Sequence, residues 1–302
     1  MEKPLVVVFG ATGFIGRHVV QKLLSRGYLV RAAVRRPEQA LFLKSMGDVG
    51  QVSRVRADVC SEGDVSEATI GAGAVVNSVG ILTERGSQSF HNLHVFGTQL
   101  MIKAAIGAKV QHFVQISAIG ADVTSPSKYS KSKALGEAAL NQFPGAVSIL
   151  RPSLVFGAQD KFFNRFAAMS RFSPVMTIIN GGTRFQPVYV GDVAEATARV
   201  LAKPPKSKDI IELGGPRTYS FRELIELTLQ QVGRRRFLAS ISDRIAMPIA
   251  FLLGLLPDPP LTIDQVRLLR RDNITSPTAQ ELADLDIVPT PLEVILPQYL
   301  RR

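Results

Sequence analysis

The feature that most constrains the fold is a glycine-rich turn, FGATGFIGR (residues 9–17), between two apolar segments. The preceding LVVVF (5–9) is typical of a short buried strand, and the apolar residues after the turn repeat at helical spacing up to Gly27. Gly10 permits a tight turn, Gly13 lets a phosphate approach the backbone, and Gly16 lets the helix pack closely on the strand. The free N–H groups of the helix N-terminus would then face the phosphates of a dinucleotide. We predict that this segment binds such a cofactor through Gly10, Thr12, Gly13, Phe14, Ile15 and Gly16.

Short β-rich segments and helical segments alternate through the first half of the chain. Residues 28–34, 51–57, 74–80 and 112–117 are typical of further strands, and helical stretches separate them. Alternation of this kind, with β-branched residues in the strands, is typical of α/β proteins with a parallel sheet. The sequence therefore predicts a Rossmann-type, doubly wound parallel sheet.

The second half is less regular. Residues 146–157 indicate a strand and a turn, 185–202 a strand and a helix, and 210–215 another strand. Residues 218–233 predict a helix that opens with a capping box of Ser220 and Glu223. We expect a Rossmann domain of residues 1–155 plus 186–215, and a smaller, mostly helical C-terminal lobe of residues 156–185 plus 216–302.

Charge and composition restrict the class of protein. The chain has 302 residues, 46% of them hydrophobic, and its single cysteine, Cys60, excludes an intramolecular disulfide. Its net charge is +11, and residues 1–214 hold 25 of the 36 basic and 15 of the 25 acidic side chains. A basic half attracts nucleotide phosphates or anionic lipid. Because no long run of like charge and no aromatic–basic interleaving occurs, we predict no nucleic-acid partner.

Two segments bear on location. The N-terminus, MEKPLVVVFGATG, enters the first strand directly and has no signal-peptide pattern, so we expect no export of a primary product that begins here. IAMPIAFLLGLL (245–256) has twelve residues without charge, whereas a membrane span needs about twenty. We therefore expect no transmembrane span, and we favour a buried helix of the second lobe for 245–256. The alternative is a surface that contacts a membrane or a partner.

The ends of the next strands bear on the choice of cofactor. Arg35 and Arg36 follow the second strand, where an NAD site usually carries an acidic residue for the ribose hydroxyl. Guanidinium groups there suit a 2′-phosphate, so we predict NADP(H) in preference to NAD(H), which stays an alternative. Asp58 would accept from the adenine amino group or cap a helix. We expect the remaining floor of the site to come from Val59, Asn77, Val79 and Gly80.

Residues 125–133, SPSKYSKSK, place Tyr129 and Lys133 one helical turn apart. A phenol and an ammonium on one face can move a proton, although a solvated helix start would look the same. His91 and His94 are three residues apart but lack a third ligand, so we predict no metal site. The aromatic residues of 162–172 recur at helical spacing and indicate core rather than a substrate pocket.

These motifs, with RPSLVFG (151–157) and QPVYVGDVA (186–194), resemble the extended or atypical short-chain dehydrogenases/reductases. The resemblance implies that Tyr129 exchanges a proton with a substrate oxygen, that Lys133 lowers the Tyr129 pKa and binds the nicotinamide ribose, and that Ser117 polarises the same oxygen. Two positions depart from the family pattern. Ala118 follows Ser117 where a catalytic serine is often found, and His94 stands where an asparagine is common. We add to the predicted cofactor set Ser117, Tyr129, Lys133, Pro152, Ser153 and Val155.

A closer resemblance extends over nearly the whole chain. TRFQPVYVGDVA, ELGGP, PLTIDQVRLLRRDN and ADLDIVPTPLEVILPQYL are similar to segments of the nucleotide-binding accessory subunits of respiratory complex I and their bacterial homologues. This implies bound NADPH, and complex I subunits or another membrane-associated assembly as partners, whereas possible membrane contact through 245–256 is suggested by the apolar sequence of that segment. It also implies a peripheral position on the cytoplasmic face of a bacterial inner membrane, or on the matrix side for a mature mitochondrial chain.

Two functions follow as hypotheses. One is an accessory or assembly subunit of NADH:ubiquinone oxidoreductase or a related quinone-linked assembly, with a structural or weakly catalytic cofactor. The other is an active NADP(H)-dependent reductase or epimerase that uses Tyr129 and Lys133 on a small carbonyl or sugar-nucleotide compound.

Overall fold

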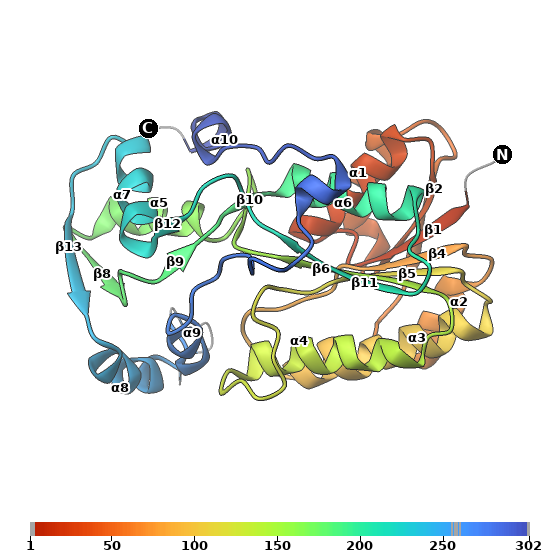
Figure 1. The fold of residues 1–302 in the computed structure, drawn as a ribbon, viewed down its shortest axis with the longest axis horizontal. Coiled ribbons are helices and arrows are strands. Elements are labelled where there is room, and N and C mark those ends of the chain that lie inside the picture. Colours follow the sequence, from red (N-terminus) through yellow and green to blue (C-terminus); the bar gives the residue numbers. More distant parts are fainter. Residues whose placement is uncertain (1–3, 255, 257–258, 260, 301–302) are drawn as a thin grey trace.

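The computed structural model describes residues 4–254, 256, 259 and 261–300, and a seven-stranded parallel sheet runs through its centre (Figure 1). The strand order is β11-β6-β5-β4-β1-β2-β3. This confirms the predicted doubly wound sheet. The strands are β1 (Leu5–Phe9), β2 (Leu29–Val34), β3 (Val52–Arg56), β4 (Ala74–Asn77), β5 (His112–Ile116), β6 (Ala146–Pro152) and β11 (Lys208–Leu213).

Helices cover both faces of the sheet (Figure 1). Helices α1 (Phe14–Ser25) and α6 (Val190–Ala202) and the 3₁₀ segment η1 (Pro37–Met46) pack on one face, where Val6 and Val8 point. Helices α2 (Glu62–Thr69) and α3 (Gly97–Gly107) pack on the other face, where Val7 and Phe9 point. Helix α4 (Lys128–Ala139) lies on that same side. Because successive strand residues face opposite sides, β1 must be apolar throughout to be buried by both layers.

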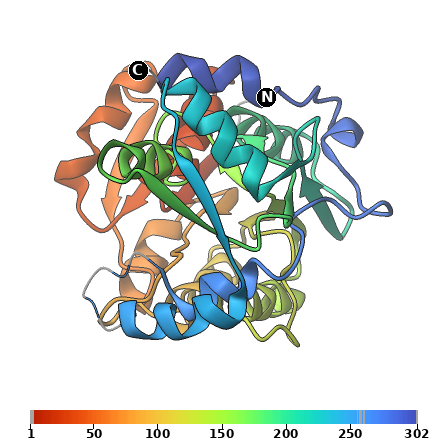
Figure 2. The ribbon, with the colours of Figure 1, turned by 90° about the vertical axis from the view of Figure 1, so that its left-hand side faces the viewer.

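The second lobe adjoins the carboxyl edge of the sheet, and Figure 2 shows its outer side. Three two-stranded sheets connect its segments: β7 (Val155–Phe156) with β10 (Val188–Tyr189), β9 (Arg184–Phe185) with β12 (Tyr219–Ser220), and β8 (Val175–Ile179) with β13 (Phe237–Ile241). The pair β8–β13 was not predicted, because its strands are about sixty residues apart and neither shows a clear local pattern. The helices are α5 (Phe163–Phe172), α7 (Phe221–Gln231), α8 (Asp243–Leu253), α9 (Ile263–Leu268) and α10 (Leu292–Tyr299).

Helix α7 begins with the predicted capping box. The Glu223 amide donates to the Ser220 hydroxyl over 3.2 Å, and the Ser220 amide donates to the Glu223 carboxylate over 2.6 Å. Two N–H groups that the first turn cannot satisfy internally are thereby bonded. The remaining short helical segments are η2 (His91–Phe96), a π-helical turn, and the 3₁₀ turns η3 (Leu140–Gln142) and η4 (Leu282–Leu285).

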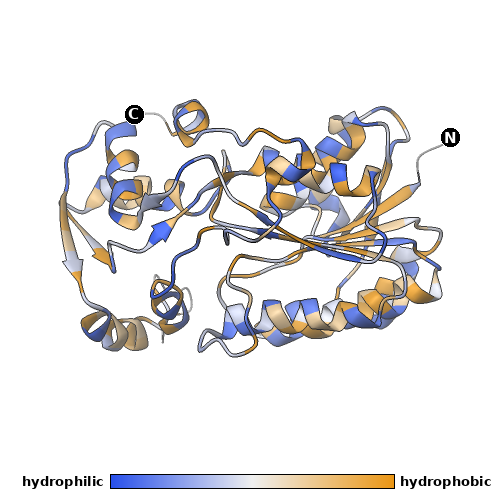
Figure 3. Cartoon of the chain, in the orientation of Figure 1, coloured by the Kyte–Doolittle hydropathy of each residue, from blue (hydrophilic) through white to orange (hydrophobic). Residues whose placement is uncertain are grey.

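The prediction that 245–256 is a buried helix is wrong. Only Ala246 and Ala250 of α8 are fully buried, against Ile179 and Val266. Most of its large residues are exposed, and Figure 3 shows hydrophobic colour along much of this helix. Alanines are small enough for the close approach of α9, and the bulkier residues occupy the opposite face. Five large apolar residues of this segment have exposed fractions between 41% and 66%: Ile245, Ile249, Phe251, Leu252 and Leu256. Leu255 lies outside the described residues.

The prediction of core for 162–172 is confirmed for the first turns of α5 only. Phe163 is fully buried, and Phe162 and Phe166 pack against core residues. Met169 and Phe172 are exposed, although Ser170 between them is buried. Within the described ranges, no helix combines the length and hydropathy needed to cross a membrane.

Removing the capping box tests how much this local contact stabilises the second lobe. We expect Ser220→Ala to lower the free energy of unfolding by about 1 kcal/mol, because the Glu223 amide loses its acceptor. Urea denaturation measures the change. Ser45→Ala is the control, since the exposed Ser45 hydroxyl only donates to the Phe42 carbonyl and its loss should stay within about 0.5 kcal/mol. An S220A effect no larger than that of S45A would contradict the assignment.

Candidate functional site

The glycine-rich turn lies where the strand order reverses, between β1 and β4. This is the position at which open α/β sheets bind ligands. Gly10 has φ of 76°, and a Cβ there would lie 3.0 Å from the Ser78 backbone. A Cβ on Gly16 would lie 2.1 Å from the Gly10 carbonyl oxygen, which no side chain allows. Gly13 is the N-cap of α1 and has no capping side chain. The first turn of α1 thus presents its amides outward, and these residues fit a pyrophosphate group.

Arg17 supports this turn from the same helix, a role that was not predicted from the sequence. Its guanidinium donates to the Thr12 carbonyl over 2.8 Å and to the Gly13 carbonyl over 3.3 Å, and it lies 5.0 Å from the Phe42 ring centroid. The only signal in the sequence is a cation directly after the last glycine. Arg17 therefore holds the turn in shape and adds positive charge beside the exposed amides.

The predicted cofactor-selecting residues lie at the ends of β2 and β3. Arg35 and Arg36 are exposed directly after β2. Asp58 is exposed after β3, and its carboxylate accepts from the Cys60 amide over 2.9 Å. The alternative of Asp58 as a helix cap is wrong, because Ser61 is the N-cap of α2. Contact of Asp58 with adenine stays a prediction, as does a role for the neighbouring buried Val59.

The end of β4 forms a rigid floor. The buried Asn77 amide donates to Thr98 over 3.1 Å and to Gln115 over 3.0 Å, while its oxygen accepts from the Val79 amide over 3.0 Å. The side-chain amide of Asn77 therefore links the backbone at Val79 to the side chains of Thr98 and Gln115. Gly80 borders Lys133, since a Cβ at Gly80 would lie 3.4 Å from the Lys133 ammonium. Cofactor contact by these residues stays a prediction.

The helix that carries Tyr129 and Lys133 is capped by the second lobe. The Asp264 carboxylate, on α9, accepts from the Lys128 amide over 2.7 Å, the Tyr129 amide over 3.1 Å and the Ser127 hydroxyl over 2.8 Å. A negative group at a helix N-terminus is stabilising. Because 135 residues separate Asp264 from Tyr129, no local pattern in the sequence could have shown this contact.

Burial shifts the pKa values of both residues of the pair. It lowers the pKa of Lys133 to about 8, although the negative charge of Glu137 acts to raise that pKa. The Lys133 ammonium donates to the Ile116 carbonyl over 3.2 Å. Burial raises the pKa of Tyr129 to about 12, and the phenol ring packs edge-on against Phe90 and His94. A general base that works at neutral pH needs a pKa shifted the other way. In this form of the protein Tyr129 is thus a protonated phenol.

The Ser117 hydroxyl is hydrogen-bonded to an ion pair. It donates to the Glu137 carboxylate, which the Arg151 guanidinium grips at 2.6 Å and 3.0 Å. The hydroxyl proton is thereby committed to a charged acceptor, and charge-assisted bonds of this kind are strong. Ala118, which follows, has no hydroxyl to replace it. A catalytic role for Ser117 stays a prediction that requires this bond to break.

His94 joins the floor to the Tyr129 helix. The Ile81 amide donates to its Nε2 over 3.1 Å, and its Nδ1 lies 2.8 Å from the Ser132 hydroxyl. Ser132 donates its own proton to the Tyr129 carbonyl, so Nδ1 carries the imidazole proton and Nε2 is the acceptor. Burial, with the charge of Lys133, lowers the pKa of His94 to about 2. His94 is therefore a neutral link and His91 is exposed. In the part of the chain that the structure covers, no three His, Cys, Asp or Glu residues group as metal ligands.

The turn after β6 meets the second lobe. The Ser153 hydroxyl lies 2.7 Å from the Asn273 carbonyl oxygen, and Pro152 is buried beside it. Val155, half-buried, begins the short pairing of β7 with β10. These predicted cofactor residues thus lie where the two parts of the chain join.

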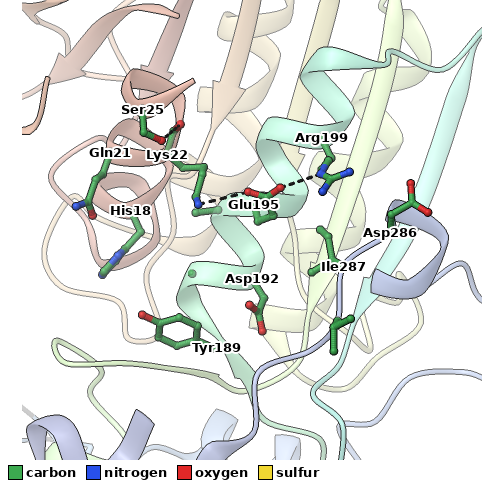
Figure 4. A pocket seen from close by; sticks show the side chains of 13 residues that line it. His18, Gln21, Lys22, Ser25, Tyr189, Asp192, Glu195, Arg199, Asp286 and Ile287 are labelled. Carbon is green, nitrogen blue, oxygen red and sulfur yellow. Dashed lines mark hydrogen bonds and ion pairs between the residues drawn. The ribbon is translucent and has the colours of Figure 1, made fainter. Parts of the chain in front are cut away.

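A separate groove of about 660 Å³ lies between α1, α6 and residues 286–288 (Figure 4). Within it, Glu195 pairs with Lys22 at 3.4 Å and with Arg199 at 2.8 Å. None of the predicted cofactor residues lines this groove. It is therefore distinct from the dinucleotide site.

Comparisons with known proteins agree with this geometry. A family model described as NAD(P)H-binding matches residues 10–153, which include the turn, the floor and the Tyr129 helix. The mitochondrial NADH dehydrogenase [ubiquinone] 1 alpha subcomplex subunit 9 of Arabidopsis thaliana is 33% identical, over 96% of this chain and 75% of its own length. The chain belongs to the subunit 9 family. It contains an NAD(P)H-binding domain, as the sequence analysis predicted.

Solved structures place this member of the subunit 9 family among Rossmann-type proteins. MoeE5 in complex with UDP-glucose and NAD is 20% identical with a TM-score of 0.73, over 98% of this chain and 97% of the other. The NADPH-dependent quinone oxidoreductase QOR2 of Escherichia coli, complexed with NADPH, is 19% identical with a TM-score of 0.74, over 98% of each chain. At this identity the likeness shows the fold alone.

Gly16 tests the phosphate-binding turn. We expect Gly16→Ala to abolish NADPH binding in isothermal titration and to lower stability, because the new methyl would overlap the Gly10 carbonyl. Gly63→Ala, also in the first turn of a helix, is the control, since a Cβ at Gly63 meets nothing within 4 Å. We expect G63A to bind NADPH as the wild type does and to be about 0.5–1 kcal/mol more stable. NADPH binding by G16A at wild-type affinity would contradict the assignment.

His94 predicts a pH dependence of stability. Its folded pKa of about 2 lies below the ordinary 6.5, so below pH 6.5 the unfolded chain binds the extra proton and stability falls as pH falls. His112, lowered to about 4, contributes in the same direction between pH 6.5 and 4.

Urea denaturation at pH 7.0 and 5.0 measures this effect. In the wild type, His94 should lower the free energy of unfolding by up to about 1.4 kcal/mol for each pH unit below 6.5. We expect His94→Asn to remove this contribution, since asparagine does not titrate. Exposed His91→Asn is the control and should leave the pH profile unchanged. Equal slopes for H94N and the wild type would refute the neutral assignment.

Proposed function

We propose that this protein is an NADP(H)-binding accessory or assembly subunit of NADH:ubiquinone oxidoreductase (complex I) or a related quinone-linked membrane assembly, with a structural or weakly catalytic cofactor. The observation that carries the proposal is the bond between Ser117 and the Glu137–Arg151 pair. It leaves the Tyr129–Lys133 pair without the second hydroxyl that carbonyl chemistry needs. The predicted cofactor floor keeps its residues in place, whereas the predicted acid–base set lacks a free serine hydroxyl.

The same proposal covers partners, location and domain roles. The subunit 9 relatives are named as parts of the respiratory NADH dehydrogenase, which supports complex I subunits as partners. We place this chain peripherally, on the cytoplasmic face of a bacterial inner membrane or on the matrix side for a mitochondrial chain. Residues 1–155 plus 186–215 would bind the nucleotide, and residues 156–185 plus 216–302 would meet the partner or the membrane, the latter through 245–256.

The preference for NADP(H) rests on Arg35 and Arg36. Both are exposed at the end of β2, and a guanidinium group pairs with a 2′-phosphate but offers no acceptor to a ribose hydroxyl. We expect NADPH to bind at least about tenfold more tightly than NADH. The double variant R35A/R36A should lose that difference while keeping its NADH affinity, both measured by isothermal titration. A wild-type preference for NADH would overturn the assignment.

The second candidate is an NADP(H)-dependent reductase or epimerase on a small carbonyl or sugar-nucleotide compound. The intact pair of Tyr129 and Lys133 favours it. Under this alternative, Tyr129→Phe would abolish turnover and fail to complement a deletion strain, although NADPH binding stays near normal. Under our proposal, Y129F complements fully, because the phenol hydroxyl has no chemical step to perform.

Native purification from detergent-solubilised membranes tests the assembly role. We expect defined respiratory subunits and one tightly bound NADPH to copurify with the tagged full chain, both identified by mass spectrometry. The G16A variant is the matched comparison for the nucleotide. A wholly soluble monomer without respiratory subunits, together with a Y129F strain that fails to grow, would favour the enzyme instead.

A further inference from the structure

Helix α9 of the second lobe lies against the start of helix α4, as Figure 1 shows. Its Asp264 carboxylate accepts through Oδ1 from the Lys128 amide. Through Oδ2 it accepts from the Tyr129 amide and from the hydroxyl of Ser127, which is the N-cap of α4. One side chain of the second lobe therefore bonds three donors at the start of the helix that carries the predicted tyrosine–lysine pair.

Two arginines of the same segment hold the loop that joins β5 to α4. The Arg267 guanidinium donates to the Pro126 carbonyl over 3.1 Å. Arg271 pairs with Asp122 at 3.0 Å. Residues 264–271 thus contact both the loop and the first turn of the helix, so the position of that turn depends on the second lobe.

The first turn of α9 is itself fixed. Thr262 and Gln265 form a capping box in which each backbone amide donates to the other side chain over 3.2 Å. Val266 is fully buried in the cluster that α9 shares with α8. Because the turn is fixed on both sides, Asp264 loses little conformational freedom when it contacts α4.

We propose that Asp264 is a positioning residue for the nicotinamide half of the nucleotide site, and that bound NADPH and the contact of α9 with α4 stabilise each other. Lys133, predicted to bind the nicotinamide ribose, lies one helical turn after Tyr129. This inference deepens the proposed function, on which it rests, because it adds a link through which nucleotide occupancy reaches the second lobe.

The link should act on one half of the cofactor. The Lys133 ammonium reaches the Ile116 carbonyl and borders Gly80, so a displaced α4 would move the ammonium relative to this floor. The adenosine half is predicted to lie at the ends of β2 and β3. Among the described residues, every hydrogen bond of the Asp264 side chain goes to the start of α4. Release of α9 should therefore weaken contacts to the nicotinamide half and leave those to the adenosine half unchanged.

Asp264→Asn tests the link from the protein side. Asparagine has one acceptor oxygen, and its NH₂ group would face the backbone donors that the second carboxylate oxygen accepts from. We expect D264N to weaken NADPH binding at least about fivefold in isothermal titration. Its affinity for adenosine 2′,5′-bisphosphate, the adenosine half of the cofactor, should equal that of the wild type.

Asp243→Asn is the matched control. It removes an acidic side chain from the first turn of α8 and breaks a pair with Arg270 at 2.8 Å, within the second lobe. We expect D243N to bind both ligands as the wild type does. Urea midpoints establish that each variant is folded. If D264N is not, R267Q/R271Q supplies the same test, because it removes the two contacts to the loop and should weaken NADPH binding alone.

Hydrogen exchange tests the link from the nucleotide side, since coupling between two sites is reciprocal. In the wild type, NADPH should slow amide exchange in residues 262–271 at least about fivefold, and adenosine 2′,5′-bisphosphate should not. In D264N, NADPH should not slow it either. Helix α10, which packs in a different core cluster, is the internal control and should show no such change.

Three results would overturn the inference. These are wild-type NADPH affinity in D264N, equal losses of affinity for NADPH and for the bisphosphate, or exchange in 262–271 that NADPH leaves unchanged. In each case the wild type still binds NADPH, so the proposed function stands. A wild-type chain that binds no NADPH overturns both. Coupling without copurification of respiratory subunits overturns the accessory role and leaves the link intact.

Discussion

One buried carboxylate organises the centre of this protein. Glu137, on α4, accepts the Ser117 hydroxyl at the end of β5 and both arms of Arg151 on β6. Arg151 also lies 3.8 Å from Glu212 on β11, whose other oxygen accepts the Ser276 amide. Three strands, a helix and the C-terminal segment thus meet in one charge network. Removing one partner would leave the others buried without compensation, at a cost of about 3–5 kcal/mol.

The same network is the basis of the proposed function. A serine that polarises a substrate needs a free hydroxyl, and Glu137 takes that hydroxyl. The Asp264 cap and the Ser153–Asn273 contact then tie the nucleotide floor to the second lobe. Helix α9, which supplies Asp264, also packs on α8 through Val266. Helix α9 therefore connects the predicted nucleotide floor, which it contacts through Asp264, to helix α8, which it contacts through Val266.

Local physics explains what the sequence could predict. The glycine turn, the Ser220 capping box and the apolar strands are each specified by neighbours within a few residues, so pattern alone was enough. Contacts across the chain could not be predicted in this way. Asp264 and Tyr129 are 135 residues apart, and the His94 tautomer depends on Ser132 and Ile81 together. The exposure of α8 could not be predicted either, since a charge-free segment has the same pattern whether it faces a core or a membrane.

The presence of Tyr129 and Lys133 does not by itself indicate catalysis. The Tyr129 ring fills the space beside Phe90 and His94, so a smaller residue would leave a cavity. The Lys133 ammonium reaches the Ile116 carbonyl and lies against Gly80, where it supports the floor whether or not a reaction occurs. Packing and support of the predicted cofactor floor are therefore roles that the pair can have without catalysis. Our proposal of a mainly nucleotide-holding role therefore rests on Ser117, whose hydroxyl donates a hydrogen bond to Glu137.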